Sequence, residues 1–169
     1  MNRAFVKDPD DAGRPEEVPE RPQSPHPNYV TPGGLKQLEA MAEGLSAHHD
    51  RLREAGKLAD PRELATVQRD LRWVEGRLQR AIRVDPAAQA LDRVGFGMTV
   101  EVRDEGGRIE TYRIVGEDEA DAAQGKVSWV SPLAEALLHA QPGDEVIWRR
   151  PAGRMRLEVL AIWPGAATN

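Results

Sequence analysis

The stretch Gly56-Lys57-Leu58-Ala59-Asp60-Pro61-Arg62-Glu63 decides the fold, because two apolar heptad patterns meet there. Before this stretch, seam positions recur at spacings of three and four, at Leu35, Leu38, Ala42, Leu45, His49 and Leu52. After it, the same spacing recurs at Leu64, Val67, Leu71, Val74, Leu78 and Ala81. Such spacing is typical of a coiled-coil seam. The two seams therefore predict an antiparallel helical hairpin over residues 29–85, with residues 56–63 as its tip.

Local signals predict where the two helices begin and end. Thr31 followed by Pro32 is typical of an N-cap and the first helical position. Gly56 suits the left-handed conformation that ends many helices. The second helix is expected to end near residues 84–86, because proline disfavours helix at the residue before it. At about 1.5 Å per residue, an arm of some twenty residues would reach about 30 Å.

Residues 1–28 differ in composition from the rest of the chain. They are rich in proline, aspartate, glutamate and arginine, and their sizeable apolar side chains are Phe5, Val6 and Val18. Such a segment buries too little surface to offset the entropy of ordering it. We therefore expect a disordered tail that is rich in proline and acidic residues.

Composition limits the function classes. The chain has 169 residues, no cysteine and a net charge of −5. Disulfides and thiolate metal sites are thus excluded, and a general nucleic-acid binder would need a basic excess. No apolar run approaches the ~20 residues that span a membrane, and the N-terminus lacks the apolar core of a signal peptide. We expect a cytoplasmic protein without a membrane partner.

The C-terminal part has a different periodicity. After a linker at 86–93, apolar residues alternate in short runs separated by turn residues, a pattern typical of strands with one buried face. One short helix is expected at 133–139, and the acidic loop at 116–121 is interpreted as a solvated turn. The pattern predicts an α+β domain over residues 94–165. Its expected strands span residues 94–102, 108–115, 126–130, 145–149 and 154–163.

Several of these stretches resemble bacterial transcription elongation factors of the Gre type, the GreA/GreB-like transcript cleavage factors. The most specific is Tyr112-Arg113-Ile114-Val115-Gly116 with its acidic continuation to Asp121. The resemblance covers about residues 29–163. Its other stretches are residues 31–38, 75–77, 96–97, 131–138 and 151–153.

The resemblance implies a mechanism as well as a fold. Residues 94–165 would form an FKBP-like domain that docks on RNA polymerase, and the hairpin would enter the secondary channel of the polymerase. Tip carboxylates of such factors help to hold a second magnesium ion, so that the polymerase itself cuts a backtracked transcript at the RNA 3′ end. The resemblance thus implies that the protein is not itself an enzyme and has no cofactor of its own. The magnesium would belong to the polymerase.

The tip departs from the family pattern, which reads Gly-Asp-Leu-Lys-Glu-Asn-Ala-Glu. Aligned without a gap, Asp60 matches one catalytic acid and is the candidate catalytic and metal-binding residue. Glu63 matches a later acid, and Lys57 replaces the other catalytic acid. Asp60 and Glu63 also have the spacing of a helix capping box. Two interpretations therefore stay open: a cleavage stimulator that uses Asp60, and a cleavage-deficient homologue that competes at the secondary channel.

Two further sets of residues are candidate binding surfaces. Arg53, Lys57, Arg62 and Arg69 form either solvated helix faces or a basic face that follows a nucleic acid or an acidic channel. The second set consists of Ser131, Pro132 and Leu133. These residues either dock on the polymerase or only start a helix. A prolyl isomerase, suggested by the FKBP-like domain, and a coiled-coil adaptor are the alternative functions from other classes.

Overall fold

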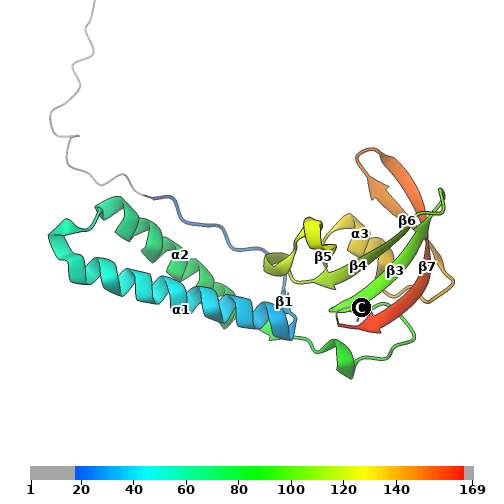
Figure 1. Cartoon of the computed structure of the whole chain (residues 1–169), viewed down its shortest axis with the longest axis horizontal. Coiled ribbons are helices and arrows are strands. Elements are labelled where there is room, and N and C mark those ends of the chain that lie inside the picture. Colours follow the sequence, from blue (N-terminus) through cyan, green and yellow to red (C-terminus); the bar gives the residue numbers. More distant parts are fainter. Residues whose placement is uncertain (1–17, 166–169) are drawn as a thin grey trace, which may run out of the picture. The chain divides into compact units, whose positions relative to one another are not determined.

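The computed structural model describes residues 18–165, so the predicted disorder of residues 1–17 lies outside the described residues. Helices and strands are both present, and one helix is long (Figure 1). The helices are α1 (Pro32–Ala55), α2 (Pro61–Gln79) and α3 (Pro132–Leu137). The strands are β1 (Asn28–Val30), β2 (Ala81–Arg83), β3 (Met98–Asp104), β4 (Ile109–Val115), β5 (Lys126–Ser128), β6 (Glu145–Arg150) and β7 (Gly153–Pro164).

The described chain divides into two compact units. The first unit holds residues 18–23 and 40–76, and the second holds residues 24–39 and 77–165. In the first unit α1 and α2 contact each other, with His48 Nε2 3.0 Å from Glu63 Oε1. Val67 and Val74, two of the predicted seam residues, are buried.

The helix starts follow the sequence signals. The Thr31 hydroxyl oxygen accepts a hydrogen bond of 2.9 Å from the backbone N–H of Gly34, as an N-cap does. Helix α1 ends at Ala55, and Gly56 has a φ of +55°. A short 3-10 turn follows over Gly56–Leu58, and α2 begins at Pro61.

The end of α2 differs from the expectation near residues 84–86. Helix α2 stops at Gln79, and Ala81 lies in strand β2 instead of on the helical seam. Strand β2 pairs in parallel with β1, with Asn28 opposite Ala81. The Asn28 side chain also donates a 2.8 Å hydrogen bond to the carbonyl of Arg77 in the last turn of α2. The chain before α1 therefore caps α2 and pairs with the chain after it.

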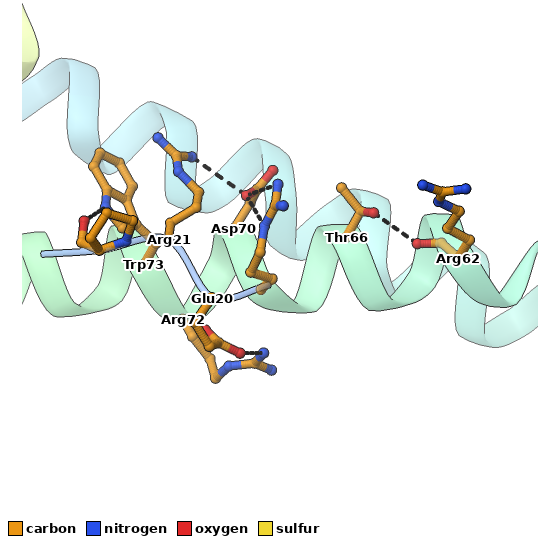
Figure 2. A network of polar contacts seen from close by, with 9 residues as sticks. Glu20, Arg21, Arg62, Thr66, Asp70, Arg72 and Trp73 are labelled. Atoms are coloured by element: carbon orange, nitrogen blue, oxygen red, sulfur yellow. Dashed lines mark hydrogen bonds and ion pairs between the residues drawn. The ribbon is translucent and has the colours of Figure 1, made fainter. Parts of the chain in front are cut away.

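The expectation of a disordered tail is wrong for residues 18–27. Residues 18–23 contact α2 through charged, aromatic and amide groups (Figure 2). Ser24 donates a 2.9 Å hydrogen bond to Glu117 in the second unit. These polar contacts to residues distant in the sequence order a segment that has little apolar surface of its own.

The C-terminal residues form the predicted five strands and one helix. The strand order is β5-β4-β3-β7-β6, with β4 and β5 parallel and the other neighbours antiparallel. Strand β3 begins at Met98 instead of residue 94, because Gly97 turns the chain with a φ of +80°. The core beneath the sheet contains Val94, Val100, Val102, Ile114, Leu133, Ala134, Leu137, Ala140, Leu157 and Val159.

Within residues 18–165, every helix is too short or too polar to cross a bilayer.

Gly44 is a weak point of α1 that can be improved. It lies in the helix interior, is exposed, and a Cβ there would meet no atom within 4 Å. Gly44→Ala is expected to raise the free energy of unfolding by about 0.5–1 kcal/mol, because alanine loses less backbone entropy in a helix. Urea unfolding followed by circular dichroism at 222 nm measures the change.

Gly56→Ala is the matched control for Gly44→Ala. Its added Cβ would also meet no atom within 4 Å, but its φ is +55°. We expect a loss of about 1–2 kcal/mol, because a side chain is disfavoured in the left-handed region. Equal effects of the two substitutions would contradict this account of helix α1 and its end.

Candidate functional site

Asp60 combines an exposed position at the tip with a role as a helix cap. Its Oδ1 accepts a 2.9 Å hydrogen bond from the backbone N–H of Arg62, and its carbonyl accepts one of 3.0 Å from Leu64. The residue is exposed. Asp60 thus satisfies backbone donors at the start of α2 and still faces solvent.

Glu63 has a different partner from the one that a capping box predicts. Its Oε1 lies 3.0 Å from His48 Nε2, so its carboxylate joins α2 to α1 close to the tip. The contact becomes an ion pair when His48 is protonated. A capping-box glutamate would instead reach back to the backbone N–H of Asp60. The sequence spacing alone could not separate these two arrangements.

The four cations predicted to form a basic face differ in their exposure and in their partners. Arg53, Lys57 and Arg62 are exposed near the tip. Arg69 instead donates from Nε and Nη2 to Asp70 Oδ1 at 2.9 and 2.8 Å. The exposed cations therefore gather at the tip, and the charge of Arg69 is balanced locally.

The tip by itself offers few metal ligands. Among residues 18–165, no group of three or more His, Asp or Glu could hold a metal ion. Magnesium takes six oxygen ligands, and a single carboxylate such as Asp60 supplies one or two. Asp60 would therefore need the ligands of another molecule to take part in a magnesium site.

Leu58 is a tip residue that the sequence analysis did not single out. Its side chain is 93% exposed, within the 3-10 turn between α1 and α2. The exposure of a single apolar residue in a turn cannot be predicted from the sequence, because single exposed apolar residues are common and form no pattern. Lys57 and Leu58 are therefore exposed tip residues close to Asp60 in the sequence.

The predicted docking residues have mixed roles. Ser131 caps α3, with its hydroxyl oxygen accepting a 3.2 Å hydrogen bond from the N–H of Ala134. Leu133 is buried in the core and is therefore not a surface residue. Pro132 is exposed and follows the cap as the first residue of α3. Of the three residues, Pro132 is the one that a partner could reach.

Pro132 belongs to a surface hollow between α3 and β6. The hollow has a volume of about 280 Å³ and is lined by Pro132, Glu135, Ala136, Ile147 and Arg149. Ile147 is 45% exposed there. The alternation of β6, with Val146 and Trp148 packed against the core, could have identified Ile147 as an outward-facing residue.

The acidic loop after β4 is a structural junction, which corrects its interpretation as a solvated turn. Buried Arg77 donates to Asp118 Oδ2 at 2.6 Å and to the side-chain oxygen of Asn28 at 2.5 Å. The Thr31 hydroxyl donates to Glu119 Oε2 at 2.5 Å, and Glu119 is buried. The loop thus binds the residues at the start of α1 and the end of α2.

Comparison with known proteins identifies the family. A family model described as "Transcription elongation factor, GreA/GreB, C-term" matches residues 88–164. The chain is 36% identical over 151 residues to transcription elongation factor GreB of Neisseria meningitidis serogroup B, covering 80% of this chain and 93% of the relative. This chain belongs to the GreA/GreB family of transcription elongation factors.

Other GreA and GreB proteins are similar as well. Transcription elongation factor GreA of Alkalilimnicola ehrlichii is 40% identical over 128 residues, covering 74% of this chain and 80% of the relative. The solved structure of a GreA/GreB factor from Nitrosomonas europaea is 26% identical, covers 79% of this chain and 97% of that chain, and has a TM-score of 0.40.

Part of the GreA/GreB resemblance reflects architecture and not chemistry. Thr31, Arg77 and the acidic residues 117–119 lie in three separate stretches that carry the resemblance, and they contact one another in the second unit. The similarity at these residues therefore concerns how the chain folds. The tip, where Lys57 replaces an acid, has to be judged by its own chemistry.

Proposed function

We propose that this GreA/GreB family member binds RNA polymerase and inserts a helical hairpin, formed by α1 and α2, into the secondary channel. Helix α1 has 24 residues and is therefore about 36 Å long, a length suited to reaching a buried active site. Residues 94–165 would have an FKBP-like fold and would dock outside the channel. The polymerase would supply the magnesium and would perform any transcript cleavage in the cytoplasm, with the RNA 3′ end as the substrate.

Lys57 is the observation that carries the proposed role at the tip. It is an exposed cation in the turn before α2, and Asp60 follows it by three residues. An ammonium group repels an incoming magnesium ion: two unit charges at ~4 Å repel by about 1–4 kcal/mol depending on the effective dielectric, and a divalent ion is repelled by about twice as much. The protein would therefore occupy the channel as a regulator that stimulates transcript cleavage weakly or not at all.

A cleavage stimulator is the second candidate function, and the exposure of Asp60 favours it. The cap bond uses Asp60 Oδ1, and the side chain still faces solvent. Its carboxylate could thus add a ligand to a magnesium ion that the polymerase already holds.

A transcript cleavage assay on stalled, backtracked complexes tests the role of the tip. The wild-type protein is expected to leave the cleavage rate nearly unchanged and to slow the cleavage that a stimulating GreA/GreB relative induces. Lys57→Asp is expected to raise the cleavage rate at least about tenfold, which corresponds to about 1.4 kcal/mol within the Coulomb range above. Asp60→Ala added to Lys57→Asp should abolish that gain.

Lys36→Asp is the matched control, since Lys36 is an exposed lysine of α1 far from the tip in sequence. It makes the same charge change and should leave cleavage unaffected. Rapid cleavage with the wild-type protein that is lost in Asp60→Ala would refute the regulator and support the stimulator.

The hollow between α3 and β6 is the proposed docking surface for the polymerase. Ile147→Ser is expected to weaken polymerase binding about fivefold, because burying a half-exposed isoleucine contributes about 1 kcal/mol. Fluorescence anisotropy of the labelled protein with RNA polymerase measures the dissociation constant. Ile109→Ser is the control, because Ile109 is 54% exposed on β4. Equal losses in both variants would remove the hollow as the docking surface.

A further inference from the structure

In the segment of residues 18–23, Glu20 and Arg21 contact α2 through their charged side chains (Figure 2). The Glu20 carboxylate pairs with Arg72, and Arg21 Nη1 lies 3.5 Å from Asp70 Oδ1. The Arg21 guanidinium carbon is also 3.8 Å from the ring centroid of Trp73, a cation–π contact. Glu20 thus meets a cation of the helix, and Arg21 meets the Trp73 ring and a carboxylate that also accepts from Arg69.

The backbone and the amide side chain of the same segment are also bound. The Trp73 indole N–H donates a 3.2 Å hydrogen bond to the carbonyl of Pro22, and the Gln23 side chain donates one of 2.9 Å to the carbonyl of Trp73. A Cβ at Gly76 would lie 2.8 Å from Gln23 Nε2. The absence of a side chain at Gly76 therefore makes room for Gln23.

These contacts together distinguish one peptide sequence from others. An acid, a cation, a backbone carbonyl and an amide are each met by a different group of α2. Pro19 and Pro22 restrict the free segment, which lowers the entropy lost on binding. The ion pair of Glu20 with Arg72 is more than half exposed on both sides, so it contributes little to binding. We therefore expect the segment to be bound weakly.

We propose that Asp70, Arg72, Trp73 and Gly76 form a peptide-binding site, the Trp73 surface. Its ligand is an extended peptide with the pattern Glu-Arg-Pro-Gln, and residues 20–23 are a tethered, displaceable copy of that ligand. Tethering gives a weak ligand a millimolar effective concentration, so the chain's own segment fills the site until a competing peptide displaces it. This site is independent of the tip and of the proposed function.

The indole resonances of the full-length protein test the proposal. The sequence has four tryptophans, so ¹⁵N-labelled protein gives four indole N–H signals, and Trp73→Phe identifies the one from Trp73. In the double variant Glu20→Ala, Arg21→Ala the Trp73 signal should shift. Its exchange with water should become about fivefold faster, as expected for the loss of one hydrogen bond.

A peptide added in trans then separates a binding site from a passive contact. A synthetic peptide with the sequence of residues 18–24, titrated into the double variant, should return the Trp73 signal to its wild-type position with saturation. A peptide of the same composition in reversed order should not. Arg53→Ala, which removes an exposed cation elsewhere in the first unit, should leave the Trp73 signal in place.

The proposal is overturned if the double variant and the wild type share one Trp73 signal position, since the segment would then not occupy the site. It is also overturned if the added peptide leaves the Trp73 signal unmoved, or if the reversed peptide moves it equally.

Discussion

Arg77→Ala is expected to lower the free energy of unfolding of the second unit by about 3 kcal/mol or more. The guanidinium of Arg77 is 1% exposed and donates to Asp118 and to buried Asn28. Removing it leaves the Asn28 amide oxygen without this donor, which costs about 1–3 kcal/mol. It also deprives the Asp118 carboxylate, whose side chain is 22% exposed, of its cation, and it opens a cavity where the guanidinium is buried.

Urea unfolding followed by tryptophan fluorescence measures the effect, because Trp129 and Trp148 pack against the core of this unit. Arg77→Lys should lose less stability than Arg77→Ala, since lysine keeps the charge but lacks the planar fork that serves two acceptors. Arg83→Ala, at an exposed position of β2, is the control and should change stability by less than about 0.5 kcal/mol. A small loss in Arg77→Ala would show that the junction is not a stabilising network.

Gly116→Ala is expected to destabilise the same unit by about 2–3 kcal/mol, although it adds only one methyl group. A Cβ on Gly116 would lie 2.4 Å from the backbone carbonyl oxygen of Tyr29 in β1. Backbone cannot rotate away as a side chain can, so β1 has to move. Such overpacking typically costs 1–3 kcal/mol. Moving β1 would also disturb the Tyr29 ring, whose centroid is 5.0 Å from that of Trp129.

Gly33→Ala is the matched control for this substitution. A Cβ there would lie 3.7 Å from Glu119 Oε1, an ordinary contact, and the residue is in the first turn of α1. We expect it to be neutral or slightly stabilising in the same urea unfolding experiment. If Gly116→Ala were equally well tolerated, the close approach of β1 to the loop would not limit the fold.

The elements that the sequence predicts well are those with strong local signals. Thr31 and Pro32 start α1 as expected, and Gly56 follows its last residue. The C-terminal strands and α3 also follow local alternation and capping. These elements are encoded by residues within a few positions of each other, so a single sequence is sufficient to predict them.

The elements that the sequence does not predict depend on distant partners. Strands β1 and β2 have three residues each, which is too short for alternation to be recognised, and they lie about fifty positions apart in the sequence. The order of residues 18–23 likewise depends on Asp70, Arg72 and Trp73. Hydrogen bonds and ion pairs between distant polar residues leave no periodic pattern in either partner.

The candidate site shows the same division. Sequence spacing left Asp60 as a helix cap or a metal-binding acid; its bond to the N–H of Arg62 confirms the cap, and the metal-binding role stays a prediction. Sequence spacing could not assign Glu63 to His48, because that contact depends on how α1 and α2 pack together. The residues predicted to dock on the polymerase included Leu133, which is buried in the structure. The sequence of a short helix does not reveal which of its faces is buried.

The parallel pairing of β1 with β2, together with the junction formed by Thr31 and Arg77, fixes both ends of the intervening helices. Residues 28–30 and 81–83 lie side by side within the second unit, which the chain leaves after residue 39 and re-enters at residue 77. The length and tip sequence of the segment between them can therefore change without moving either attachment point. A protein built in this way can acquire a new tip, such as one with Lys57, while the C-terminal sheet keeps its fold.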